Sequence, residues 1–315
     1  MKSIYVSDLD PGGSAEGFFV LRRLELAESG GTQRLVLELG DKTGRIGGVM
    51  WQGFHDAVRA LQVGDPVKIR ANVGTYQGKL QLTVDRIRKA EGAEIDASDF
   101  LAVSPRDKQE MIDELKALIS TITDVHLNKL LEGFVAGPLF DDFCLAPAGK
   151  LWHHAYLSGL LEHTLSVIRL CDFAAGNYPE VDRDLLLLGA VFHDVGKVRE
   201  LCWTTFIDYT DDGRLVGHLV MGERILTDLI AAIPDFPDHR AMELRHLLLS
   251  HHGEKERGSP IPAQTLEAMI LSGIDDLDAR ANAILRIEST EKQPGTKWSK
   301  WVNLIERFIY FGQDD

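Results

Sequence analysis

The sequence predicts a two-part chain, in which a small five-stranded β-barrel is followed by an all-α helical bundle. Up to about residue 90, short β-rich runs alternate with glycine-containing turns. From about residue 105 onward, apolar residues recur at helical spacing. Nine of the 11 histidines lie between His153 and His252. A length of 315 residues is enough for two or three domains.

The barrel is expected from five strand-like runs with one short helix between the third and the fourth. The strands are predicted at 18–21, 35–39, 46–51, 67–73 and 80–84, and the helix at 54–61. Three strands, a small helix and two further strands are the order of a five-stranded Greek-key barrel.

The rest of the chain is predicted to be helical almost throughout. We expect helices at 105–122, 125–136, 139–145, 154–174, 182–194, 217–233, 238–251, 262–286 and 298–310, with a loop or hairpin at 208–214 and a loop at 253–262. The predicted organisation is therefore a barrel at 1–90, a linker at 91–104, a helical connecting segment at 105–150, a metal-bearing helical domain at 151–290, and a C-terminal helix within 291–315 packed on that domain.

Composition narrows the class of protein. The formal net charge is -14, but residues 1–90 hold 13 basic and 10 acidic residues against 21 and 38 in the remainder. This argues against a protein that binds nucleic acid over its whole surface and leaves the barrel mildly basic. Three dispersed cysteines, no secretory signal and no apolar run of about 20 residues predict a cytoplasmic protein with no membrane partner. Homo-oligomerisation is left open.

Histidines and acids stand at the ends of apolar helices. The run Leu185–Phe192 leads directly into His193-Asp194, and Leu247–Leu249 leads into Ser250 and His251-His252. A buried unpaired carboxylate is costly, so Asp194 needs a cation or strong donors. Neutral imidazole and carboxylate are ordinary ligands of divalent transition metals. Each histidine taken singly is more often a core or surface residue, but together they indicate a metal site.

The order of these residues, H…HD…H…HH…D, resembles the HD-domain metallophosphohydrolases. The motifs W-H-H-A-Y-x-x-G-L-L-E-H-T-L (152–165), H-D-x-G-K (193–197), G-H (217–218), L-S-H-H-G (249–253) and G-S-P-x-P (258–262) narrow the resemblance to the YhaM-type 3′→5′ exoribonucleases. That family joins an OB-fold barrel to an HD domain, and the resemblance covers nearly the whole chain. One departure is Lys255-Glu256-Arg257, which leaves the contour of the substrate entrance open.

The resemblance implies a centre that holds two divalent ions. One ion is expected on His163, His193, Asp194 and Asp275, and the other on Asp194, His218, His251 and His252. Such a pair activates water and neutralises phosphate charge. Asp194, Lys197 and His154 are the expected catalytic residues. Lys197 is expected to contact a phosphate oxygen, and His153 and His154 to donate to the phosphate or the leaving group, with a core role as the alternative for His153. We favour Mn, with Fe, Co, Ni, Zn and Mg as alternatives.

The OB-fold resemblance implies a surface for single-stranded nucleic acid. Its expected stacking platforms are Phe19, Trp51 and Tyr76, and its expected phosphate contacts are Arg34, Lys68, Arg70 and Lys79. Each of these residues alone is more often core or ordinary surface. The alternative for the barrel as a whole is an oligomerisation or docking module.

These expectations combine into a metal-dependent 3′→5′ exonuclease that degrades single-stranded RNA, with DNA as a further substrate, to nucleoside monophosphates. Direction and product rest on the resemblance alone. One alternative is an HD-type hydrolase of free or cyclic nucleotides; another is a nucleic-acid-binding regulator with a structural metal site. The chain has no G-x-S-x-G or P-loop motif that would indicate other catalytic machinery.

Overall fold

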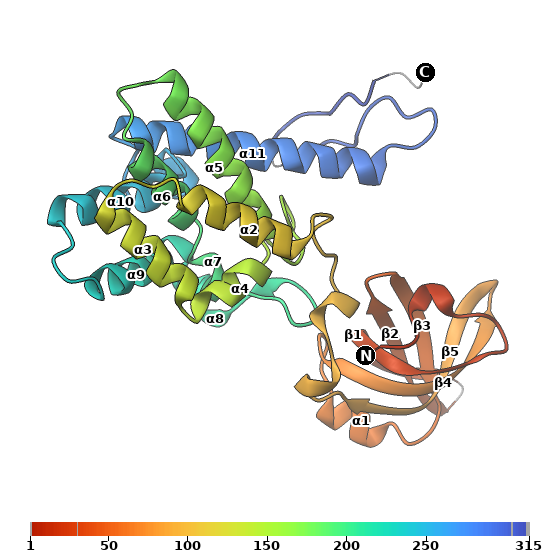
Figure 1. Ribbon diagram of the computed structural model, residues 1–315. Coiled ribbons are helices and arrows are strands. Elements are labelled where there is room, and N and C mark those ends of the chain that lie inside the picture. The colour runs from red at the N-terminus through yellow and green to blue at the C-terminus, as the bar shows by residue number, and fades with distance from the viewer. Residues whose placement is uncertain (1, 30, 304, 313–315) are drawn as a thin grey trace. The chain divides into compact units, whose positions relative to one another are not determined.

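The computed structural model describes residues 2–29, 31–303 and 305–312, and they fold into two compact units (Figure 1). The first unit contains the chain up to Val103 together with Trp203–Ile207, and the second contains Ser104–Cys202 and the chain from Asp208 onward. The first is a closed β-barrel and the second is helical, which confirms the predicted fold class. Among the described residues, no helix has the length and apolarity that a membrane span requires.

The barrel closes in the strand order β1-β2-β3-β5-β4, with β4 returning to pair with β1. Its elements are η1 (Val6–Asp8), β1 (Ser14–Ser29), β2 (Thr32–Asp41), β3 (Gly44–Met50), α1 (His55–Ala60), β4 (Pro66–Tyr76) and β5 (Lys79–Lys89), followed by η2 (Gly92–Glu94) and η3 (Ala97–Asp99). Only the β3–β5 pair is parallel among the pairs in this barrel. Closure of this kind leaves no unpaired sheet edge.

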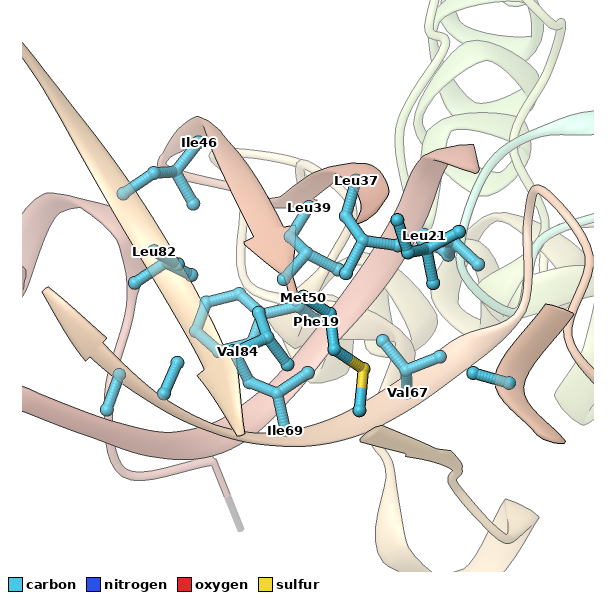
Figure 2. Packing of buried hydrophobic residues seen from close by; sticks show 14 of the residues in the cluster. Phe19, Leu21, Leu37, Leu39, Ile46, Met50, Val67, Ile69, Leu82 and Val84 are labelled. Carbon is cyan, nitrogen blue, oxygen red and sulfur yellow. The ribbon is translucent and has the colours of Figure 1, made fainter. Parts of the chain in front are cut away.

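Inward-pointing apolar side chains alternate with outward-pointing ones along the strands, and the inward set forms the barrel core. Leu35, Leu37 and Leu39 of β2 point inward and are almost completely buried. Phe19 of β1 lies in the same core, where Figure 2 shows it with buried side chains from the other four strands, and its exposed fraction is 0%. The expectation that Phe19 stacks on nucleic acid is therefore wrong, because its ring is not accessible.

The helical unit contains α2 to α11 and a two-stranded hairpin. Its elements are α2 (Lys108–Ile119), α3 (Val125–Ala136), α4 (Leu139–Leu145), α5 (Gly159–Asn177), α6 (Arg183–Phe192), α7 (Lys197–Glu200), β6 (Leu201–Cys202), β7 (Asp208–Tyr209), α8 (Asp211–Val216), α9 (His218–Ala231), α10 (Asp238–Ser250), η4 (Lys255–Arg257) and α11 (Leu266–Glu291). Helix α5 packs on α6 and α11, and α6 also packs on α10; these four helices are labelled in Figure 1.

Several of these helices begin after an aspartate that caps the first turn. The side chains of Asp107, Asp124 and Asp182 accept hydrogen bonds from the first free backbone amides of α2, α3 and α6. Every residue of α6 from Asp184 to Phe192 is buried, so this helix is surrounded by its neighbours. The residues that follow α6 are consequently held at the centre of the unit.

Two helix predictions differ from the structure. The helix expected at 154–174 begins at Gly159, because His154 and Ser158 adopt left-handed backbone conformations. The helix expected at 298–310 is absent among the described residues of that segment. Residues 298–303 and 305–310 instead form two extended arms that pair with each other. There Trp298 pairs with Tyr310 and their rings lie 4.8 Å apart. Cross-strand aromatic packing of this kind stabilises extended backbone rather than a helix.

Candidate metal centre

Five helices bring the predicted metal-ligand residues together at the centre of the helical unit. His163 lies on α5, His193 and Asp194 follow α6, and His218 opens α9. His251 and His252 follow α10, and Asp275 lies on α11. His163, His193, Asp194 and His251 are each at most 2% exposed. The seven residues span more than 100 positions of the sequence, from His163 to Asp275.

The first group consists of His163, His193 and Asp275. The Nε2 atoms of His163 and His193 lie 3.2 Å apart, and His163 Nε2 lies 3.1 Å from Oδ1 of Asp275. One ligand atom from each of the three lies within 4.8 Å of the other two. Ligands of one ion at about 2.1 Å from it lie roughly 3 to 3.5 Å from each other, which fits this spacing.

The second group consists of His218, His251 and His252. The Nε2 atoms of His218 and His252 are 3.3 Å apart, and a nitrogen of His251 completes a set within 4.8 Å. The ring centroids of His251 and His252 lie 4.4 Å apart. This second set has the donor chemistry of a transition-metal site as well.

Asp194 lies between the two groups and turns one carboxylate oxygen to each. Its Oδ1 lies 3.6 Å from Nε2 of both His218 and His251. Its Oδ2 lies 3.3 Å from Nε2 of His193 and 3.6 Å from Nε2 of His163. This is the geometry of a carboxylate that can contribute a ligand to two neighbouring ions.

The opposite nitrogens of these rings are held by carbonyl or carboxylate oxygens. Nδ1 of His193 donates to Ala190 O at 2.8 Å, and Nδ1 of His251 donates to Leu248 O at 2.7 Å. Nδ1 of His163 lies 2.7 Å from Asp278 Oδ2, and Nδ1 of His218 lies 3.0 Å from Glu200 Oε1. An acceptor at Nδ1 keeps the proton there and leaves Nε2 free to bind metal.

Asp278 and Glu200 were not among the residues predicted from the sequence. Asp278 follows Asp275 by three positions on α11, and helical periodicity places two such residues on one face. Glu200 ends α7, a helix that the sequence did not predict. The i, i+3 spacing of the two aspartates was the one available signal for Asp278.

Buried polar atoms without partners test whether the residues fit a metal ion. Asp194 Oδ1 and His251 Nε2 are buried and have no hydrogen-bond partner among the described residues. Leaving a buried charged oxygen unsatisfied is costly. The two atoms lie 3.6 Å from each other, and a divalent cation bound by both would satisfy them, so the donor set fits such a cation.

The pKa values of His163 and Asp194 reflect the attraction between cationic groups and carboxylates at this centre. Burial lowers the pKa of His163, but hydrogen bonds to Asp275 and Asp278 outweigh it and raise the value to about 9. Burial would raise the pKa of Asp194, but the charge of Lys197 and the neighbouring histidines hold it well below its usual range. Asp194 is therefore ionised at neutral pH.

Gly196 allows the close approach that positions His218. A Cβ atom at residue 196 would lie 1.9 Å from the carbonyl oxygen of His218 and 2.7 Å from the amide nitrogen of Gly222. The turn after Asp194 therefore packs its backbone directly against the first turn of α9. A side chain at this position would push α9 and its ligand away from the centre.

A hollow of about 210 Å³ opens beside the metal-ligand residues. Its wall includes Asp194, Lys197, His251, Asp275 and His153. His154 does not line it: its side chain is buried, and its backbone amide donates to Asn282 Oδ1 at 2.8 Å. Of the two histidines expected to donate to the phosphate or the leaving group, His153 therefore lines this hollow and His154 does not.

Lys197 lines the hollow while its Nζ lies 2.5 Å from Asp194 Oδ2. Burial would lower its pKa, but the charge of Asp194 and the hydrogen bond between them raise it. Lys197 is therefore a buried, positively charged group at the edge of the hollow.

On the barrel, the remaining predicted nucleic-acid residues fall into three pairs. The guanidinium of Arg34 lies 5.6 Å from the ring of Trp51, which is 49% exposed. Tyr76, 60% exposed, pairs with Lys79 across the β4–β5 turn. Lys68 and Arg70 line a hollow of about 510 Å³ beside α1, where Lys68 lies 3.5 Å from Glu16.

Both units of the chain match known protein families. The family model described as "HD domain" matches residues 160–280, and the model described as "OB-fold nucleic acid binding domain" matches residues 20–90. The chain is 32% identical over 308 residues to the 3′-5′ exoribonuclease YhaM of Listeria welshimeri, covering 96% of each chain. It is 33% identical over 285 residues to the 3′-5′ exoribonuclease YhaM of Bacillus subtilis, covering 90% of this chain and 89% of that protein.

Proposed function

Since this chain belongs to the YhaM 3′-5′ exoribonuclease family, we propose that its helical unit removes nucleoside monophosphates from the 3′ end of single-stranded RNA in a metal-dependent hydrolysis. The protein is a hydrolase of phosphodiester bonds with an HD domain. The observation that carries the proposal is the position of Asp194, whose two carboxylate oxygens face two separate histidine groups.

Two ions would share Asp194. We assign His163, His193, Asp194 and Asp275 to the first ion, and Asp194, His218, His251 and His252 to the second. When bound, the pair supplies an activated water at neutral pH and neutralises charge on the phosphate. Mn is the ion we favour for this mixed histidine and carboxylate set, and Fe, Co, Ni, Zn and Mg are alternatives.

Two residues of the chain would act on the substrate directly. The ammonium group of Lys197 is buried and charged, so it would hold a non-bridging oxygen of the phosphate. Burial, first of all, and the charge of Lys197 lower the pKa of His153 well below its usual value. His153 is thus a neutral ring at pH 7 and would donate a single N–H hydrogen bond to the substrate in the hollow.

The barrel would guide the strand. Trp51 offers an exposed ring beside Arg34, and Tyr76 and Lys79 repeat this combination at the β4–β5 turn. Stacking on an aromatic ring accepts any base, and a neighbouring cation holds the phosphate. Since stacking does not distinguish ribose from deoxyribose, we include single-stranded DNA as a second substrate.

Single-stranded RNA labelled at either end tests the proposal. With Mn²⁺ we expect 3′-labelled RNA to release labelled mononucleotide at once, and 5′-labelled RNA to shorten progressively. Chelator and Asp194→Ala should abolish both, whereas Asp228→Ala, which removes an exposed acid of α9, should keep both. Turnover of free or cyclic nucleotides without any shortening of RNA would favour a small-nucleotide hydrolase, and RNA binding without any hydrolysis would favour a regulator.

A further inference from the structure

A second hollow of about 360 Å³ adjoins the one beside the metal-ligand residues. The two hollows share three wall residues, Arg257, Asp276 and Ala279. A substrate that occupies the first hollow can therefore extend into the second without a break in the surface. Arg257 belongs to η4, the segment in which the sequence departs from the family pattern.

The second hollow is lined by groups that suit a nucleotide. Trp152 contributes an indole ring, and Arg257, Arg280 and Arg307 contribute three guanidinium groups. Arg307 comes from the extended C-terminal segment, so the arms that replace the expected helix form part of this wall. Planar guanidinium groups bind phosphate oxygens in pairs, and an indole ring stacks on a base.

The charges in this hollow leave a net positive balance. The carboxylate of Asp276 forms ion pairs with two arginines: its Oδ1 lies 2.9 Å from Nε of Arg280 and 3.5 Å from Nη1 of Arg257. Arg307 donates to the backbone carbonyl of Ile305 at 2.8 Å and has no carboxylate partner among the described residues. With Glu306 as the second acid, three guanidinium groups face two carboxylates. An anion in the hollow would be attracted.

We propose that this hollow binds the nucleotide that precedes the 3′-terminal one, with its base on Trp152 and its phosphate on Arg307 and Arg280. The inference rests on the proposed function and deepens it, because it adds a contact that a polynucleotide makes and a small phosphodiester does not. Arg257, at the junction of the hollows, would contact the phosphate between the two nucleotides.

The test compares an oligoribonucleotide with bis(p-nitrophenyl) phosphate, which has no preceding nucleotide. We expect Arg307→Ala to raise the KM for the oligonucleotide roughly 10-fold and to change its kcat and the hydrolysis of the small ester less than about 2-fold. The slope of log KM against log salt should also fall by about 0.7. The backbone bond from Val302 N to Arg307 O is kept in this variant.

Two further comparisons separate substrate contact from general effects. Trp152→Ala should raise the KM for the oligonucleotide, and Trp152→Phe should retain most of the affinity, because a phenyl ring still stacks. Arg245→Ala removes an equal charge from α10, outside both hollows, and should leave the KM unchanged.

An unchanged oligonucleotide KM in both Arg307→Ala and Trp152→Ala, with RNA still degraded by the unaltered protein, would overturn this inference alone. An equal loss on both substrates would overturn it too, because the hollow would then act on the metal centre. If the unaltered protein hydrolyses only the small ester, the proposed function fails, and this inference fails with it.

Discussion

Oδ2 of Asp278 lies 2.7 Å from Nδ1 of His163, and the hydroxyl of Ser166 donates to the other oxygen of the same carboxylate. Asp278 is 9% exposed and touches no other proposed metal ligand as closely. Its role would be to hold the imidazole of His163 with Nε2 directed at the ion.

Asp278→Asn should therefore weaken metal binding without removing a ligand. We expect the affinity for Mn²⁺ to fall about 10- to 100-fold, because an orienting carboxylate fixes the tautomer and basicity of its histidine. Calorimetric titration of the chelator-treated protein measures this. Asp228→Asn is the matched surface control, and an affinity equal to that of the unaltered protein would show that Asp278 has no positioning role.

Gly196→Ala should disturb both the fold and the centre. A Cβ there would lie 1.9 Å from the carbonyl oxygen of His218, so the backbone must shift. We expect a loss of about 2 kcal/mol in unfolding free energy from overpacking, together with reduced metal binding. Gly176→Ala on α5 is the control, since no atom lies within 4 Å of its added Cβ and alanine favours helix there. Equal melting temperatures for the two variants would contradict this account.

Acid sensitivity of the helical unit should depend on Asp184. Its carboxylate accepts hydrogen bonds from Thr123 N at 2.7 Å and Asp124 N at 2.8 Å. Burial would raise its pKa, but these bonds and that from the Thr123 hydroxyl outweigh burial and lower it. A lowered folded pKa means stabilisation that is present above the unfolded value and is lost as pH falls through the folded value.

Asp184→Asn should accordingly cost about 2 kcal/mol of unfolding free energy at pH 7. The cost should shrink as pH falls below about 4, where the unaltered carboxylate begins to lose its own advantage. Urea unfolding of chelator-treated protein, followed by helical circular dichroism from pH 7 to pH 3, measures the difference. A cost that stays constant over this range would count against the assignment.

Two aromatic residues of the barrel should behave in opposite ways. Trp51→Ala should weaken RNA binding by about 1 to 3 kcal/mol with little change in melting temperature, because an exposed stacking ring is lost. Phe19→Ala should instead cost about 3 to 5 kcal/mol of stability, because it opens a cavity in the core. Fluorescence anisotropy with a labelled oligonucleotide and thermal melting together test this. Unchanged RNA affinity in Trp51→Ala would remove that residue from the interface.

Features set by a local sequence pattern could be predicted, whereas features set by strand register or by contacts between distant segments could not. His193-Asp194 was predictable because a carboxylate at the end of a buried apolar helix needs a cation or strong hydrogen-bond donors. Phe19 was misplaced because neighbouring Phe18 is equally aromatic, and only strand register decides which ring points inward. Glu200 was missed because its pairing with His218 depends on a short helix and a close approach of two turns. The C-terminal arms depend on Trp298 meeting Tyr310, a contact between residues 12 positions apart.

The most direct test of the account is the position of metal at Asp194. Crystals soaked in Mn²⁺ should give two anomalous-difference peaks, one beside each carboxylate oxygen of Asp194, the first near His163 and His193 and the second near His218 and His251. A single peak, or two peaks that do not share Asp194, would contradict the proposed centre.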